Sequence, residues 1–568
     1  MKIISIHDGH NASACLLNNG KIEFAIEEER LTHIKNQSSF PTNSLKFILD
    51  QCNLKPSDID KFVFSSKHMP AYKNREELMN EYLESSSFCT LLKRAAKRKF
   101  IYNYVVKRRT KERINMALNC GFRIEQISFV AHHLSHASAA YFASPWWRNE
   151  KVLVLTNDGG GDGLCATVSV GENGMMTRLA SVNVSESLGY FYSMITFLLG
   201  MVPEEHEYKV MGLAPYSHSS KHKHLLEKFR SYFRFNDVDK GITWQRTNGC
   251  PHTQYSYSFF KKSIEQARFD HIAGAAQEFL EEFLSEWVKN CIKVTGINKV
   301  ALSGGIFLNV KANKKILELP EVSELFVYPS CGDPTNAMGA CYYTYFNQSE
   351  LKGNPQKLEV LSNLYFGPEY KDAYIEKILK EGKYNFHRST DIENEAALLL
   401  SNHEVVARFK NRMEFGARAL GNRSILAHPA SIDVIKTINE MIKNRDFWMP
   451  FAPSILSDKM DDYVVNPKKM DYPYMIMSFD SKIDHDKIYA ASHPYDKTVR
   501  PQVVYESWNP DYYKLIKHFE KLTGIGAVLN TSFNLHGYPI VCSPEDALNV
   551  FNQSGLKYLA IGNFLVKK

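Results

Sequence analysis

The sequence predicts an α/β protein of two domains, and three observations carry this prediction. At 568 residues the chain is longer than one hydrophobic core usually supports. Apolar, strand-like runs recur along it, and most are followed by helical patterns. These runs end in small or acidic residues, and α/β proteins bind their ligands at such strand ends. We expect an N-terminal domain at 1–350 and a C-terminal domain at 360–568, joined by the polar, Gly- and Pro-containing segment 345–370.

The composition is that of a globular protein, with 44% hydrophobic residues, 23% charged residues and a formal net charge of +7. The pattern of a signal peptide is missing from the first residues. The longest apolar run, 190–202, is too short and too interrupted to span a membrane, so we expect a buried helix there. The ten cysteines form no CxxC pair, which favours a reducing, cytoplasmic location.

Residues 91–113 carry ten of the Lys and Arg residues. The commoner interpretation of such a run is a solvated helical surface. The alternative is a docking surface for an anionic substrate, a membrane or a partner. Because the chain shows no known nucleic-acid motif, we expect no nucleic-acid partner.

The N-terminal domain opens with a predicted meander of three strands. Apolar runs at 3–6 and 12–17 flank the polar turn "HDGHNAS", and "NNGK" leads into a third run. Further strands are predicted at 151–158, 298–305 and 324–333. Strands alternating with helices indicate an α/β domain with its site at the strand ends.

Three glycine-bearing turns follow strands in this domain: "HDGHNAS", "DGGGDG" and "SGGIFLNV". Glycines allow successive backbone N–H groups to face an anion, and a helix N-terminus after such a turn favours phosphate. A tight hairpin explains "DGGGDG" equally well. Neither a Walker pattern nor a convincing GxGxxG accompanies the turns, but three of them in one domain favour nucleotide binding.

The segment "FVAHHLSHASAAYF", residues 129–142, places three histidines within five positions. In a helix, His132 and His136 share one face, whereas His133 lies on another and is expected to be structural or to support a metal ligand. Asp158 and Asp333, at strand ends, could add oxygen ligands for Fe(II), Mn(II) or Zn(II). Histidine pairs at this spacing also occur as packed or surface residues, so the spacing alone leaves both interpretations open.

Taken together and in order, the motifs resemble those of the O-carbamoyltransferase family, which includes the nodulation, cephem and aminoglycoside carbamoyltransferases. The resemblance covers nearly the whole chain, and its most specific motifs are "MEFGARALGNRSIL" and "LNTSFN". The other matching segments are "HDGHNASACLL", "AIEEERLT", "HHLSHASAAY", "NDGGGDG", "YKVMGLAPY", "SGGIFLNVKAN", "GDPTNAMGA", "PFAPSIL" and "TVRPQVV".

The resemblance implies an N-terminal actin/Hsp70-like ATPase fold, similar to the tRNA threonylcarbamoyl transferases. It also implies a C-terminal adenylate-forming α/β domain with a twisted, YrdC-like sheet. In the family, carbamoyl phosphate and ATP give carbamoyladenylate and pyrophosphate in the C-terminal domain. The carbamoyl group then passes to a hydroxyl of a small-molecule or glycan acceptor in the N-terminal domain, near Fe(II) or another divalent metal such as Mn, Mg or Zn.

The family's site residues are carried over position by position. His132, His136, Asp158 and Asp333 match the metal-site motifs. Asp8 and His10 match the N-terminal turn and are expected to be catalytic, with the histidine deprotonating the acceptor. The residues expected to bind nucleotide in the N-terminal domain are Gly159, Gly160, Lys209, Gly212, Ser303, Gly304, Gly305 and Asn309. Those expected to bind carbamoyl phosphate and the adenylate are Arg418, Arg423, Lys443, Arg445, Arg500, Asn530 and Ser532.

The chemistry of the last set fits its expected ligands. An arginine fork can bond two phosphate oxygens at once, and a charge pair at ~4 Å gains about 4 kcal/mol at an intermediate dielectric before desolvation. Any one of these arginines could instead pair with an acid such as Glu414 or Asp446. Asn530 and Ser532 can recognise the carbamoyl amide. Met449 stands where relatives tend to have an arginine, which leaves one phosphate contact to Lys443 and Arg445.

Two other functions stay open from the sequence. One is a threonylcarbamoyl-type transferase acting on tRNA, for which the basic segment 91–113 could be used. The other is an actin-fold sugar kinase, which the glycine turns alone support. Because the chain lacks the paired CxxC zinc motifs of the hydrogenase-maturation relatives, we expect no carbamoylation of a protein thiol. We expect an enzyme with no membrane span, acting on a hydroxylated acceptor; a homodimer is one assembly that the sequence leaves open.

Overall fold

The computed structural model describes residues 1–68, 75–84, 88–351, 358–482 and 485–568. They form two compact units. The first unit consists of Met1–Glu28 and Asn36–Leu361, and the second consists of Glu29–Lys35 and Ser362–Lys568. The change of unit after Leu361 lies within the expected linker at 345–370, of which 352–357 are outside the described residues. The sequence does not predict that Glu29–Lys35 joins the second unit.

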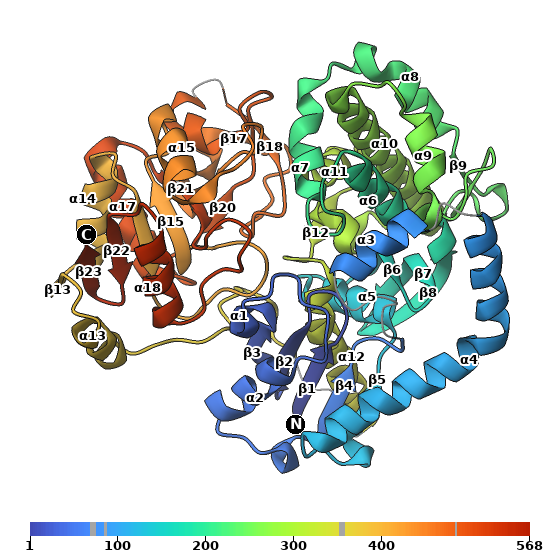
Figure 1. The fold of residues 1–568 in the computed structure, drawn as a ribbon, viewed down its shortest axis with the longest axis horizontal. Coiled ribbons are helices and arrows are strands. Elements are labelled where there is room, and N and C mark those ends of the chain that lie inside the picture. Colours follow the sequence, from blue (N-terminus) through green and yellow to red (C-terminus); the bar gives the residue numbers. More distant parts are fainter. Residues whose placement is uncertain (69–74, 85–87, 352–357, 483–484) are drawn as a thin grey trace. The chain divides into compact units, whose positions relative to one another are not determined.

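The first unit contains two five-stranded sheets with the same topology (Figure 1). In each sheet, three consecutive strands form an antiparallel meander, and two later strands add in parallel beside the first strand of that meander. Numbered within its own sheet, each therefore has the strand order 3-2-1-4-5. This duplicated topology is that of the actin-like ATPase fold, which confirms the fold predicted for the N-terminal domain.

The strands agree with the apolar runs of the sequence. The first sheet has the order β3-β2-β1-β4-β5, and the second has the order β12-β11-β6-β7-β8. The strands of the first sheet are β1 (Lys2–His7), β2 (Ser13–Asn18), β3 (Lys21–Glu27), β4 (Lys61–Phe64) and β5 (Ile127–Phe129). Those of the second are β6 (Val152–Gly161), β7 (Leu164–Glu172), β8 (Met175–Asn183), β11 (Lys299–Ser303) and β12 (Glu324–Val327).

Two helices bring the sequence motifs to the sheets. The predicted histidine helix is α5 (His132–Ala143); it packs against β6, β11 and α12 (Asn336–Leu351), and α12 packs on β1. The apolar run 190–202 gives the buried helix α6 (Leu188–Leu198). The other helices of this unit are α2 (Thr42–Gln51), α3 (Arg75–Glu84), α4 (Phe88–Asn119), α7 (Glu207–Leu213), α8 (Ser219–Arg230), α9 (Tyr257–Ser263), α10 (Phe269–Thr295) and α11 (Val310–Leu317). Of the helices that the structure describes, none is long and apolar enough to cross a membrane.

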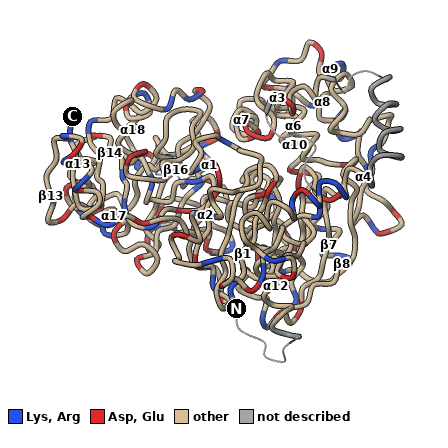
Figure 2. Tube along the Cα trace, turned by 60° about the horizontal axis from the view of Figure 1, so that its bottom comes forward, with Lys and Arg blue, Asp and Glu red and all other residues tan. Residues whose placement is uncertain are grey.

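The basic segment 91–113 lies in α4, and the side chains of 91–103 are outside the described residues. Its last residue, Arg113, is fully buried, so this arginine is not part of a solvated face. In Figure 2, Lys and Arg positions (blue) and Asp and Glu positions (red) are both scattered along the traces of both units. The net charge of +7 is therefore spread over the chain and does not by itself mark a binding surface.

The second unit is built on an eight-stranded mixed sheet with the order β13-β23-β22-β14-β15-β21-β16-β20 (Figure 1). Strands β14, β15, β21 and β22 contribute alternate residues to one apolar core, against which α18 packs. The strands are β13 (Phe386–Arg388), β14 (Val406–Phe409), β15 (Arg423–Ala427), β16 (Ala452–Leu456), β20 (Gln502–Val504), β21 (Ala527–Ser532), β22 (Tyr558–Ile561) and β23 (Phe564–Lys567). The helices include α1 (Glu29–Thr32), α13 (Asp372–Glu381), α14 (Ile392–Ser401), α15 (Ile432–Ile438), α17 (Pro510–Thr523) and α18 (Pro544–Gln553).

Candidate functional site

Four predicted ligands of the first unit converge on one point. His132 and His136 project from α5, Asp158 from β6, and Asp333 from the turn that precedes α12. One potential ligand atom from each lies within 4.8 Å of the others. The Nε2 atoms of the two histidines are 3.2 Å apart, and they lie 3.5 and 3.3 Å from Asp333 Oδ1. Asp158 Oδ2 lies 3.3 Å from His132 Nε2.

Asp162 fixes the start of the histidine helix. It lies in the β6–β7 hairpin with a positive φ of 51°, and its carboxylate accepts from the backbone N–H of His132 at 2.7 Å. The same carboxylate accepts from the N–H groups of Lys67 and His68. Burial opposes the charge of Asp162, but His132 and these donors hold its pKa below the usual value. Sequence reasoning missed this residue, although it is the second aspartate of "DGGGDG".

Glycines allow the elements around the four ligands to come together. A Cβ on Gly161 would lie 2.1 Å from the ring of His132, and one on Gly304, which has a φ of +113°, would lie 2.2 Å from the carbonyl oxygen of Asn157. Gly305 donates its N–H to Asp158 Oδ1 at 2.8 Å. The glycine turns thus shape the ligand cluster; the hairpin interpretation of "DGGGDG" is confirmed, and phosphate binding by these turns stays a prediction.

The neighbours of the cluster have defined roles. Ser303 Oγ lies 3.3 Å from His136 Nδ1, opposite the ligand side of that ring. His133 bonds Thr156 and the carbonyl of Leu164 with its two ring nitrogens, which agrees with the structural role expected for it. Gly159 and Gly160 continue β6; Gly159 packs against Gly189 and Tyr190 in the first turn of α6, and Gly160 against Val184 and Tyr190.

The buried charges of the cluster shift one another's pKa values in opposite directions. Burial disfavours charge on His132, but the carboxylates of Asp333 and Asp158 outweigh it and raise the pKa of His132 to about 9. Burial likewise opposes the charge of Asp333, yet the histidines hold its pKa well below the usual value. Two imidazole nitrogens and two carboxylate oxygens fit Fe(II), Mn(II) or Zn(II) and leave positions for other oxygen ligands. The residues present therefore could hold a divalent metal.

Asp8 and His10, expected at the acceptor end, have different surroundings. Asp8 is buried and accepts two hydrogen bonds from Arg113, at 2.6 and 2.7 Å. The carboxylate of Asp8 is committed to this arginine, which favours a positioning role over the predicted catalytic one. His10 is partly exposed, and its Nε2 lies 3.2 Å from the carbonyl oxygen of Glu204.

A strained residue holds His10 in place. Glu204 has a positive φ of 61°, and its carboxylate lies 3.9 Å from His10 Nδ1. The N–H of Glu204 donates to Glu207 Oε1 at 2.7 Å. Burial raises the pKa of Glu207 to about 7. Glu207 thus stabilises the unusual backbone that places both polar groups of Glu204 against His10.

The other residues predicted to bind nucleotide, Asn309, Lys209 and Gly212, lie on or next to helices of the first unit. The side chain of Asn309 caps α11 by accepting from the N–H of Ala312, and it also bonds Gln277 twice. This commits the side chain of Asn309 to the fold, and its expected contact with a nucleotide stays a prediction. Lys209 and Gly212 both lie on α7, the former partly exposed and the latter buried, and their contact with a nucleotide stays a prediction.

In the second unit, predicted cations gather around β21. Lys443 is buried and donates to Ser532 Oγ at 3.2 Å and to Asn534 Oδ1 at 2.6 Å. Arg445 donates to Thr531 Oγ1 at 2.8 Å. Desolvation and the positive charges of Arg418 and Arg445 lower the pKa of Arg500 well below its usual value. Neighbouring like charges cost free energy, and a bound anion would offset this cost. We call the following residues the cation cluster: Lys35, Arg418, Lys443, Arg445 and Arg500.

Lys35 enters this cluster from the opposite end of the sequence. Its charge, after desolvation and Arg445, contributes to the lowered pKa of Lys443. The segment that carries it is anchored by Arg30, which is buried and donates to the carbonyl oxygen of Gly416 at 2.9 Å. Gly416 lies two residues before Arg418. The sequence gives no signal of this contact, because the two segments lie almost 400 residues apart.

Arg423 makes contacts that the sequence does not predict. It is fully buried, and its guanidinium donates to the main-chain carbonyls of Lys410, Asn411, Asn422 and Pro368. It also lies 3.7 Å over the ring of Phe409. Desolvation lowers the pKa of Arg423 to about 10. Four main-chain contacts indicate that Arg423 holds the loop before β15, and the phosphate contact expected for it stays a prediction.

Asn530 presents one open acceptor beside the cation cluster. Its amide N–H groups donate to Ala419 O, Ser454 Oγ and Gln502 Oε1. Within the described part of the chain, its buried Oδ1 has no hydrogen-bond partner. A buried unpaired acceptor is costly, and a ligand N–H would satisfy it. Asn530 is thus oriented to receive an amide donor.

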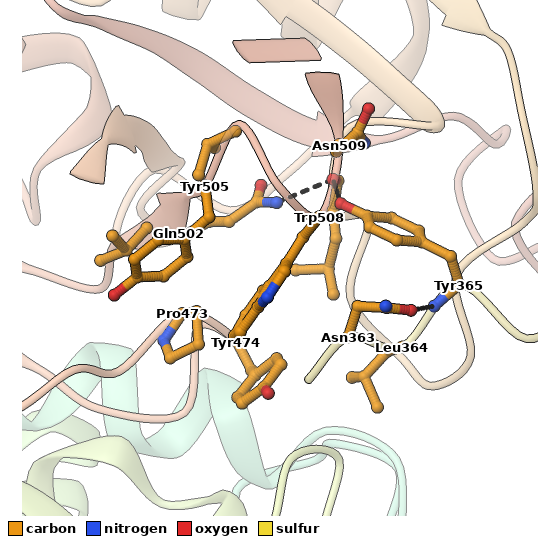
Figure 3. Close-up of a pocket in the computed structure, with 12 residues that line it drawn as sticks. Asn363, Leu364, Tyr365, Pro473, Tyr474, Gln502, Tyr505, Trp508 and Asn509 are labelled. Atoms are coloured by element: carbon orange, nitrogen blue, oxygen red, sulfur yellow. Dashed lines mark hydrogen bonds between the residues drawn. The ribbon is translucent and has the colours of Figure 1, made fainter. Parts of the chain in front are cut away.

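An aromatic pocket adjoins the same amide network (Figure 3). The rings of Tyr474 and Trp508 stack there with centroids 5.9 Å apart. Gln502, which lines the pocket, donates to the carbonyl oxygen of Leu420 at 2.7 Å, the dashed line from its amide in Figure 3. Gln502 thus connects this pocket to Asn530, whose amide donates to Gln502 Oε1, and to Leu420 in the loop after Arg418.

Comparison with known proteins identifies relatives along the whole chain. A family model described as Carbamoyltransferase N-terminus matches residues 2–342, and one described as Carbamoyltransferase C-terminus matches residues 397–568. The nodulation protein NolNO of Sinorhizobium fredii is 31% identical, over 98% of this chain and 79% of that protein. An uncharacterized protein of Methanocaldococcus jannaschii is 32% identical, over 100% of this chain and 99% of its own.

Solved structures are more distant. The HypF protein of T. kodakarensis is similar over 63% of this chain and 49% of its own, at 13% identity and a TM-score of 0.32. Component A of the Acidaminococcus fermentans (R)-2-hydroxyglutaryl-CoA dehydratase covers 61% of this chain and 99% of its own, at 15% identity and a TM-score of 0.33. The fold assignment rests on the strand orders above, not on these similarities.

The raised pKa of Glu207 predicts a pH-dependent stability. An acid with a pKa near 7 when folded and 4.5 when unfolded stabilises the folded chain at low pH, and this contribution is lost as the pH rises from 4.5 through 7. Relative to Glu207→Gln, the wild type should lose up to about 3 kcal/mol between pH 4.5 and pH 8.5. Unfolding measured at several pH values checks this, with the exposed Glu286→Gln as the control. Parallel curves for wild type and Glu207→Gln would contradict it.

The cation cluster predicts opposite effects for two arginines. Arg500→Gln should raise the thermal midpoint of the ligand-free chain by a few degrees, because it relieves like-charge repulsion, and should abolish the stabilisation given by millimolar pyrophosphate. Arg423→Gln should lower the midpoint and keep the pyrophosphate response, because it removes contacts to main-chain carbonyls and to the ring of Phe409. A thermal shift assay measures both. Equal pyrophosphate responses of wild type and Arg500→Gln would refute the anion site.

Proposed function

The chain belongs to the carbamoyltransferase family, and we propose that it uses ATP to pass the carbamoyl group of carbamoyl phosphate to a hydroxyl of a small-molecule or glycan acceptor. It is a carbamoyltransferase enzyme, as the matches to both halves of the chain show. The proposal adds the route, through carbamoyladenylate, and the class of acceptor.

We assign the activation step to the second unit. Carbamoyl phosphate, ATP and one water give carbamoyladenylate, pyrophosphate and inorganic phosphate, so several anionic groups must be brought together. The cation cluster offers the positive charge for these groups and for the departing pyrophosphate. The open Oδ1 of Asn530 and the hydroxyl of Ser532 can bond the carbamoyl amide.

We assign the transfer step to the first unit. His10, held by Glu204, takes the proton of the acceptor hydroxyl. The hydroxyl oxygen then attacks the carbamoyl carbon, and AMP leaves. His132, His136, Asp158 and Asp333 would hold the divalent metal, Fe(II) by the resemblance. A metal there would polarise the carbamoyl carbonyl as a Lewis acid.

The observation that carries the proposal is the pairing of two different sites in one chain. The first unit has a buried cluster of nitrogen and oxygen ligands, and the second has the cation cluster beside an open amide acceptor. An actin-fold sugar kinase would use the first and leave the second without a task. A threonylcarbamoyl transferase acting on tRNA would need an amino-acid substrate in place of carbamoyl phosphate, and the product experiment below separates the two. Cytoplasmic location and a homodimer stay predictions.

The proposal is tested by product analysis. The full chain is incubated with Fe(II), ATP, carbamoyl phosphate and a panel of hydroxylated metabolites and oligosaccharides, and products are scored by mass. We expect one product that has gained a single carbamoyl group, formed only when both ATP and carbamoyl phosphate are present. A product that requires threonine and bicarbonate, or simple phosphorylation of the acceptor, would replace the proposal with one of its alternatives.

His10 should matter for transfer but not for activation. His10→Asn is expected to lower the transfer rate by roughly 10²–10⁴-fold, the range of a lost general base. Adenylate formation, followed as pyrophosphate release in the absence of acceptor, should stay within about twofold of wild type. The exposed His387→Asn serves as the control. An equal loss of both activities would show that His10 acts on the fold rather than on the acceptor.

A further inference from the structure

His7 is a buried histidine next to the ligand cluster that the proposed mechanism does not use. It ends β1 and is 2% exposed. Its Nδ1 lies 3.1 Å from Ser65 Oγ. Its Nε2 lies 3.5 Å from Asp333 Oδ2, and its ring meets that of His132 edge to face at 6.2 Å.

The other nitrogen of this ring is almost without a partner. Within the described residues, His7 Nε2 makes no hydrogen bond, and the carboxylate of Asp333 at 3.5 Å is its ion-pair neighbour. A Cβ on Gly9 would lie 2.6 Å from the same Nε2, so the turn keeps a glycine where the ring needs space. A buried N–H without an acceptor costs free energy. The carboxylate of Asp333 is the acceptor that faces His7 Nε2, which explains the orientation of the ring.

The two oxygens of Asp333 face different groups. Oδ1 lies against the Nε2 atoms of His132 and His136, whereas Oδ2 faces His7. Asp158 is divided in the same way, because Oδ1 accepts from the N–H of Gly305 and Oδ2 faces His132. Each carboxylate of the cluster thus has one oxygen turned to a protein donor and one turned to the histidines.

We propose that His7 is the positioning residue for Asp333: it donates its Nε2–H to Oδ2 and so fixes Oδ1 as the metal-binding oxygen. Ser65 selects the required tautomer by donating its hydroxyl hydrogen to Nδ1. Asp333 needs such a partner because it lies in a three-residue turn, Asp333–Thr335, rather than in a strand or long helix. Partners of this kind orient metal-binding side chains and change metal affinity.

His7 is not itself a ligand in this proposal. The group of ligand atoms that lie within 4.8 Å of one another comprises the four residues already named and does not include His7. The inference rests on the proposed metal site, and it concerns the residues of this chain that prepare that site.

The test measures metal binding rather than activity. The metal-free full chain is titrated with Mn(II), and free Mn(II) is followed by electron paramagnetic resonance. We expect His7→Ala to weaken binding by roughly 10–100-fold, the range found for lost supporting partners. Ser65→Ala, which changes one hydroxyl and preserves the fold, should weaken it several-fold in the same direction. His222→Ala removes another buried histidine of this unit, bonded to Ser217 and Glu278, and should bind as wild type does.

Electron spin echo measurements on the Mn(II)-loaded chains count the bound histidine nitrogens. We expect two in the wild type and two in His7→Ala. Three in the wild type and two in the variant would make His7 a ligand and overturn the inference, as would unchanged affinity in both His7→Ala and Ser65→Ala. If the wild type binds no divalent metal, the metal part of the proposed function fails as well, so the two failures are distinguishable.

Discussion

The first unit depends on bringing two carboxylates and two imidazoles within 4.8 Å of one another in a buried place. Burying one unpaired charge is expensive, and burying two like charges is worse. Here each charge has a partner of opposite sign. The carboxylates raise the pKa of His132, and the histidines lower the pKa of Asp333. A divalent cation would bind to the same oxygens and nitrogens, so the arrangement that stabilises the cluster also prepares it for metal.

The glycines explain how the backbone tolerates such close approach. β6, α5 and the turn after β11 come together only because no Cβ stands at Gly161 or Gly304. The duplicated sheets then bring the carboxyl ends of β1, β6 and β11 near the start of α5. In the second unit the charges are positive: desolvation and neighbouring cations lower the pKa values of Lys443 and Arg500. Each unit holds charges that a ligand of the appropriate sign would stabilise.

Much of this was predictable from short-range pattern. Apolar runs predicted the strands, the i and i+4 histidines predicted one face of α5, and aspartates after strands predicted the remaining ligands. Long-range contacts were not predictable. Lys35 joins the cation cluster because the segment Glu29–Lys35 belongs to the second unit, and a pattern of neighbours cannot show this. The carbonyl contacts of Arg423 were not predictable either, because the sequence does not distinguish an arginine that bonds carbonyls from one that bonds phosphate.

The central claim, that His132, His136, Asp158 and Asp333 hold a divalent metal, is tested most directly by crystals of the full chain grown with Mn(II). Anomalous diffraction at the metal edge should place one peak within about 2.0–2.3 Å of both histidine Nε2 atoms and of an Asp333 oxygen. The peak should disappear in His136→Ala crystals. A wild-type crystal that binds Mn(II) elsewhere, or that shows the four side chains intact with no peak between them, would contradict the account.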